Sequence, residues 1–209
     1  AAIGSWDVVP WIINRERCGF PVFAGLDPVT HGKISPEQAA LNRMKSHGTQ
    51  PWNSSPYDSV VAESALAYIK SNRPRAMWIT FGETDEWAHE RRYDRYLDAA
   101  RFTDAYLKEL WNTLQSMGQY RGKTTLIVCV DHGRGRTGKD WTSHGNKIPG
   151  ADEIWMSVLG PDTPALGERS NTETVTQSQV AATVAAAVGE DYHAAVPKAA
   201  RPLAEAIRR

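Results

Sequence analysis

The chain has 209 residues, of which 41% are hydrophobic and 23% are charged, and this ordinary globular composition suits a single domain with a sizeable core, here residues 1–209. Its 24 basic and 24 acidic residues balance, so no basic excess indicates a nucleic-acid partner. No apolar run approaches the roughly 20 residues of a membrane span, and two cysteines are too few for a disulfide framework.

The first half of the chain alternates short strands with helices. Residues 24–56 are rich in Gly, Pro, Ser, Asn and His and predict a long loop region. Loops of this length in compact domains are usually functional or disordered. Within it, Ser35 followed by Pro36 predicts the start of a helix. In order, the expected elements are a strand at 1–4, a helix at 5–13, a strand at 20–23, helices at 36–45 and from 57 to Arg73-Pro74, and a strand at 76–81.

The second half continues this alternation. The longest helix, from about residue 93 to 117, has an apolar face and is closed by Gly118. Thr176-x-x-Gln179 is a capping box that starts an alanine-rich helix ending at Gly189. The remaining expected elements are strands at 125–130 and 154–159, a loop at 131–152 and a short terminal helix at 203–209. Strands that alternate with helices favour an α/β fold with a mainly parallel sheet covered on both faces.

Two of the expected strands run directly into residues that are good metal ligands. The strand at 125–130 ends in Asp131 and His132, and the strand before it is followed by Asp85 and His89. A further histidine, His144, lies on the loop that follows. In open α/β sheets functional residues gather at the carboxyl ends of strands, and carboxylate and imidazole suit a divalent transition metal. We therefore expect one metal site assembled from three places in the sequence.

Each part of this pattern also has a simpler interpretation. Asp85 and His89 are four residues apart, which places both on one face of a helix, although they could equally converge on a loop or be exposed polar residues. Asp131 could simply cap the next element. The combination, with both pairs at strand ends, favours a site over these alternatives.

The order Asp-x-x-x-His, then Asp-His-Gly, then a later His resembles the metal-ligand order of the alkaline phosphatase superfamily. That group includes sulfatases, nucleotide pyrophosphatases and cofactor-independent phosphoglycerate mutases. The resemblance extends over most of the chain, from Ser5 to Gln179. The stretches that carry it most clearly are residues 81–89, 131–135, 141–145 and 150–155.

The resemblance implies an alkaline-phosphatase-like α/β fold and one or two metal ions, with zinc as the first choice and manganese as the second. Asp85, His89 and His144 would hold one ion, and Asp131 and His132 would help to hold the other. Paired ions of this kind clamp the attacking and leaving oxygens of a displacement at phosphorus. The expected function is therefore metal-dependent hydrolysis of a small anionic phosphoester or related ester. A non-catalytic metal-binding fragment or subunit of a larger enzyme is the alternative.

The family also has an N-terminal segment that supplies another Asp ligand and a Ser or Thr nucleophile, and this chain begins after that point. Ser5 does not match the family nucleophile. The resemblance thus leaves open a fragment truncated at its N-terminus, a short form that hydrolyses through a metal-bound hydroxide, and an inactive relic. An oligomer or a missing N-terminal partner segment is compatible with each. Many family members are periplasmic or secreted, but no signal peptide is visible here, so the localisation stays open.

Other polar residues lie beside the predicted ligands. Arg134, Arg136 and Lys139 could hold an anionic oxygen of a substrate, or they could belong to a solvated glycine-rich loop. Glu83 and Glu86 flank Asp85 and could accept a hydrogen bond from a ligand histidine.

Overall fold

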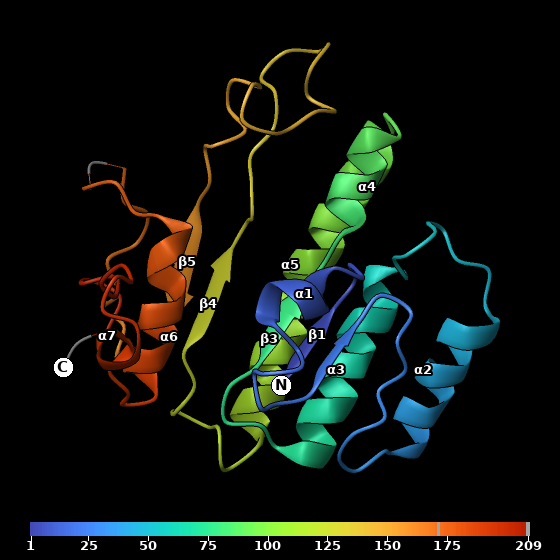
Figure 1. The fold of residues 1–209 in the computed structure, drawn as a ribbon, viewed down its shortest axis with the longest axis horizontal. Helices are drawn as coiled ribbons and strands as arrows, with labels where there is room; N and C mark the ends of the chain where they lie inside the picture. The colour runs from blue at the N-terminus through green and yellow to red at the C-terminus, as the bar shows by residue number, and fades with distance from the viewer. Residues whose placement is uncertain (171, 208–209) are drawn as a thin grey trace. The chain divides into compact units, whose positions relative to one another are not determined.

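The computed structural model describes residues 1–170 and 172–207 and has a mixed α/β fold (Figure 1). The chain forms two compact units, Ala1–Trp111 and Asn112–Arg209. The predicted α/β class is confirmed by a parallel sheet with several helices. The single domain that composition suggested stays a prediction. Among the described residues, no helix combines the length and the apolar character needed to cross a membrane.

The first unit is built on a three-stranded parallel sheet. Strand β1 (Ala2–Gly4) lies in the centre, between β2 (Val22–Ala24) and β3 (Trp78–Thr80). In this register Ile3 stands opposite both Phe23 and Ile79. The carboxyl ends of all three strands therefore lie at one edge of the sheet, and the residues that follow β3 leave from that edge.

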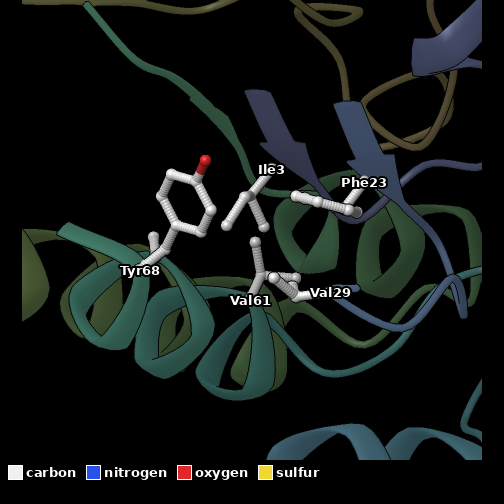
Figure 2. Packing of buried hydrophobic residues seen from close by; sticks show 6 residues of the cluster. Ile3, Phe23, Val29, Val61 and Tyr68 are labelled. Atoms are coloured by element: carbon white, nitrogen blue, oxygen red, sulfur yellow. The ribbon is translucent and has the colours of Figure 1, made fainter. Parts of the chain in front are cut away.

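Helices cover both faces of this sheet because successive strand residues point to opposite sides. Ile3 and Phe23 pack with Val61 and Tyr68 of helix α3 (Asp58–Asn72), as Figure 2 shows, and the rings of Phe23 and Tyr68 lie 6.2 Å apart. On the other face, strand residues of β1 and β2 pack with helix α1 (Val9–Ile13). The buried residues of this second cluster are Ala2, Val9, Val22 and Ala24. The expected covering of both faces is therefore present in this unit.

The long loop region at 24–56 contains helix α2 (Pro36–His47), which packs against α3. The predicted start is confirmed: the Ser35 side chain accepts a hydrogen bond from the Gln38 backbone N–H at 3.2 Å. The loop before α2 is bound to it, because the Asn42 amide bonds both the N–H and the carbonyl of Val29. These two bonds hold Val29 in the core below the sheet (Figure 2).

Two helices follow β3. Helix α4 (Glu83–His89) begins three residues after the strand ends, and the long helix α5 (Tyr93–Ser116) comes next, close to its predicted bounds. Phe81, between β3 and α4, contacts the ring of Tyr106 edge-on at a centroid distance of 5.1 Å. Both aromatic side chains thus fix α5 against the segment that leads into α4.

The second unit contains a two-stranded sheet. Strand β4 (Leu126–Cys129) pairs with β5 (Met156–Leu159) in antiparallel fashion, so this part of the chain departs from the parallel arrangement expected for the sheet. The capping box at Thr176 and Gln179 is confirmed. It opens the 3₁₀ helix η1 (Gln177–Gln179), which continues into α6 (Val180–Ala187).

The end of the chain differs from its prediction. A one-turn helix, α7 (Tyr192–Ala195), follows Asp191, whose side chain accepts a hydrogen bond from the His193 N–H. The prediction of a terminal helix at 203–209 is wrong for its described residues, because residues 204–206 form a turn. Residues 208–209 lie outside the described part of the chain. A segment this short has too few intrahelical hydrogen bonds to be stable by itself.

Candidate metal centre

Asp85 and His89 lie on helix α4, which settles the choice between helix and loop that the sequence left open. Their spacing of four residues places them on one face of the helix. The His89 Nε2 atom is 3.2 Å from the Asp85 Oδ2 atom. Both side chains are partly exposed, at 45% for His89 and 36% for Asp85. One carboxylate and one imidazole therefore converge within the first unit and are open enough to be reached by an ion.

The two glutamates that flank Asp85 have different surroundings. The Glu83 carboxylate accepts hydrogen bonds from the Asp58 backbone N–H and the Trp87 indole N–H, so these contacts do not support its expected role of orienting a ligand histidine. Burial, followed by the nearby Asp85 carboxylate, raises the pKa of Glu86.

In the second unit, Asp131 and His132 lie just after β4, separated from its last residue, Cys129, by Val130. The Asp131 side chain is 83% exposed, and its Oδ1 atom accepts a hydrogen bond from the His132 backbone N–H at 3.0 Å. The backbone before them is held by Gln177 of η1, whose side-chain amide donates to the carbonyls of Val130 at 2.9 Å and Asp131 at 2.6 Å. Two bonds from a distant 3₁₀ helix thus hold the backbone that carries the two candidate ligands.

The close packing around Gly133 explains why the third residue of the Asp-His-Gly motif is a glycine. A Cβ atom at this position would overlap the backbone carbonyl oxygens of Gly150 and Glu153. The Gly133 N–H donates to the carbonyl of Ala151 at 2.8 Å. The chain after His132 therefore packs against the far end of the 131–152 loop, and only glycine allows this close approach.

His144 lies beside His132, although it comes twelve positions later in the sequence. The two imidazole rings stack with centroids 3.9 Å apart and planes inclined by 12°. The loop folds back on itself to bring them together, since the Gly135 N–H donates to the Ser143 carbonyl at 3.1 Å. The structure therefore assembles two predicted ligands from opposite arms of one loop.

The donor chemistry of these residues fits a divalent transition metal. The His132 Nδ1 atom lies 2.9 Å from the Gly133 carbonyl oxygen, which can only accept, so Nδ1 carries the proton in this contact. The Nε2 atom of the neutral ring then has the lone pair that a metal requires. Imidazole nitrogens together with carboxylate oxygens are ligands typical of zinc.

The three basic residues of the loop differ in their surroundings. Arg136 pairs with the Glu153 carboxylate. Lys139 is exposed, and its backbone N–H donates to the Thr137 hydroxyl. Arg134 is partly buried next to Gly150. The Arg136–Glu153 pair offsets one positive charge, and the expected role of the three residues in holding an anionic substrate stays a prediction.

Sequence reasoning missed two residues that bond the backbone near the candidate ligands, Gln177 and Asp58. Gln177 falls inside the recognised capping box, and nothing in that motif indicates a bond back to β4. Asp58 is a helix-start acid, which by pattern alone is an ordinary favourable charge in a first turn. Neither role has a local signal, because each depends on contacts with a segment that is distant in sequence.

The chain was compared with known proteins. The model of a family described as the Metalloenzyme superfamily matches residues 34–188, a range that contains all five predicted ligands. No curated protein and no solved structure matches the chain.

Proposed function

Since the chain belongs to the metalloenzyme superfamily, within the alkaline-phosphatase-like clan of families, we propose that it is a metal-dependent hydrolase of phosphoesters or related esters. The superfamily implies divalent metal ions. Zinc is the metal that we propose, with manganese second, because the candidate ligands are imidazoles and carboxylates without cysteine. The substrate is proposed to be a small anionic ester.

The observation that carries this proposal is the stacking of His132 against His144. Two partly exposed imidazoles from the two arms of one loop, next to an exposed Asp131 carboxylate, bring several possible metal-binding atoms close together. The complete ligand set that we propose is Asp85, His89, Asp131, His132 and His144. A bound divalent ion would polarise a phosphoryl oxygen and stabilise the negative charge of the transition state.

The residues of the chain have defined tasks in this proposal. His132 presents Nε2 because its Nδ1 proton is directed to the Gly133 carbonyl. Arg134, Arg136 and Lys139 are proposed to bind the non-reacting oxygens of the ester by charge-assisted hydrogen bonds. Ser5 is 1% exposed, so we assign it no role as a nucleophile, and Ser5→Ala is expected to change the rate little.

The proposal is tested by metal content and hydrolysis together. Protein purified without chelator is analysed for zinc and manganese, and its hydrolysis of 4-nitrophenyl phosphate and bis(4-nitrophenyl) phosphate is measured before and after chelation. Activity is expected to vanish with the chelator and to return with added zinc. His144→Ala is expected to lower both metal content and rate, whereas His47→Ala, which changes an exposed histidine at the end of α2, is the matched control. Absence of metal uptake by the wild-type protein would show the proposal to be wrong.

A further inference from the structure

Helix α4, which carries Asp85 and His89, is too short to fix its own orientation. It has seven residues, and isolated helices of this length are not stable in water. Its N-cap residue is Gly82, which has no side chain to bond the first backbone N–H groups. A larger residue would be crowded there, since a Cβ atom on Gly82 would lie 2.7 Å from the Ser5 hydroxyl oxygen. The cap must therefore come from another part of the chain.

Asp58, the first residue of α3, supplies that cap. Its two carboxylate oxygens accept hydrogen bonds from the Gly82 N–H at 2.8 Å and the Glu83 N–H at 2.9 Å. In return the Asp58 backbone N–H donates to the Glu83 carboxylate at 2.7 Å. Asp58 is 1% exposed. Water therefore hardly competes for these bonds, and the start of α4 is fixed to the start of α3.

A further bond comes from a residue before Asp58. The Trp52 indole N–H donates to the Glu90 carboxylate at 2.8 Å. We call residues 52–58 the anchor segment. It bonds the beginning of α4 and its C-cap residue Glu90, and the Trp52 ring also contacts the Trp87 ring edge-on at 4.8 Å.

The anchor segment and the candidate ligands use different faces of α4. With 3.6 residues per turn, positions 83, 86, 87 and 90 fall on one side of the helix, and positions 85 and 89 lie roughly 130° away around its axis. Every contact of the anchor segment described above is made to the first group. The bonds of the segment therefore hold the side of α4 that faces away from Asp85 and His89.

We propose that Asp58 is a positioning residue for the metal site: it fixes α4 so that Asp85 and His89 are presented in the geometry that an ion requires. This inference rests on the proposed function. Residues that orient metal ligands typically change metal affinity by roughly 10–100-fold when they are replaced.

The test compares Asp58→Asn with Ser64→Ala. Asn keeps one acceptor oxygen but turns an NH₂ group toward the second backbone N–H, so one cap bond is lost. Ser64 lies on the same helix, is fully buried and is hydrogen-bonded to Gln38, not to α4. Zinc affinity is measured by competition with a chelating dye, well below the unfolding temperature of each variant, and the visible absorption spectrum of the cobalt-substituted protein reports ligand geometry.

Asp58→Asn is expected to bind zinc roughly 10–100-fold more weakly and to show an altered cobalt spectrum. Ser64→Ala is expected to keep both, even if its unfolding temperature falls. Glu83→Gln is the second variant, because Glu83 is only partly buried and its replacement leaves the core intact. It is also expected to weaken zinc binding. If Asp58→Asn does not fold, the zinc affinity of Glu83→Gln provides the test.

The outcomes separate the two proposals. If the wild-type protein binds zinc and Asp58→Asn, or Glu83→Gln in its place, binds it equally well with the same cobalt spectrum, the positioning role is overturned and the proposed function stands. If Ser64→Ala loses affinity as strongly as Asp58→Asn, the effect is general destabilisation and the positioning role is again wrong. If the wild-type protein takes up neither zinc nor cobalt, both proposals fail.

Discussion

Tyr106 of α5 is a residue whose ring and hydroxyl group have opposite effects on stability. The side chain is 4% exposed, and among the described residues its hydroxyl has no hydrogen-bond partner. Burial, reinforced by Glu109 and Glu63, raises the pKa of Tyr106. The ring packs on Phe81 and Phe102. The aromatic surface thus favours folding, whereas the unbonded hydroxyl opposes it.

Tyr106→Phe is therefore expected to leave the free energy of unfolding unchanged or to raise it by about 1 kcal/mol. Tyr106→Ala, which also removes the ring, should lower it by about 3–5 kcal/mol. Urea denaturation of the three proteins measures both changes. A loss of more than about 1 kcal/mol in Tyr106→Phe would mean that the hydroxyl is bonded in the folded protein.

Asp58 makes the stability of the protein depend on pH. Burial raises the pKa of Asp58 to about 7, with Glu83 and Glu86 acting in the same direction and the bonds from Gly82 and Glu83 opposing it. In the unfolded chain the pKa is about 3.9. Between these values the folded protein binds more protons than the unfolded chain does, so stability falls as pH rises through this window.

The prediction is that the free energy of unfolding of the wild-type protein decreases between about pH 4 and pH 7 relative to that of Asp58→Asn, which cannot titrate there. Denaturation at closely spaced pH values measures the difference, and the comparison cancels the contributions of other groups. Parallel curves for the two proteins would contradict the raised pKa of Asp58.

At the scale of elements, the short 3₁₀ helix η1 supports the end of β4. Gln177 donates to two successive carbonyls, those of Val130 and Asp131, directly before His132. Strand β4 has only one neighbour among the described strands, so its carboxyl end depends on such contacts. The candidate ligands of the second unit are therefore coupled to a segment 46 residues further along the chain.

Gln177→Ala is expected to leave the fold intact and to weaken zinc binding roughly tenfold, because the backbone that carries Asp131 and His132 loses both bonds. Ser178→Ala is the matched control, because the Ser178 hydroxyl is hydrogen-bonded to Thr176 in the same turn and not to β4. Dye competition and circular dichroism measure affinity and fold. Equal affinity in Gln177→Ala and the wild-type protein would show that η1 does not support the site.

At the scale of the whole molecule, a ligand that binds only the folded state stabilises it. Zinc at a free concentration of 100 times its dissociation constant should add about 2.7 kcal/mol. For a chain of this length that corresponds to a rise of roughly 5–10 °C in the unfolding temperature. His144→Ala should lose this rise and His47→Ala should keep it, as followed by calorimetry with and without zinc. An equal rise in both variants would place the zinc elsewhere.

Most of the helices could be predicted from the sequence, because their signals are local. The apolar spacing of α3 and α5, the Ser35-Pro36 start of α2 and the capping box before α6 each lie within a few residues and were found close to their bounds. The order of the candidate ligands is likewise a property of the sequence alone, and it indicated the superfamily that the family comparison supports. The ligand set itself stays a prediction.

Only the tertiary structure decided the features that depend on contacts between distant residues. It made the segment after β3 a helix, paired β4 with β5 in antiparallel fashion, and stacked His132 on His144. It also placed the Asp58 carboxylate on backbone groups 24 and 25 residues away. Local patterns contain no information on these pairings, because hydrogen bonds and burial between remote segments are formed only when the chain is folded, and their free energy overrides local preference.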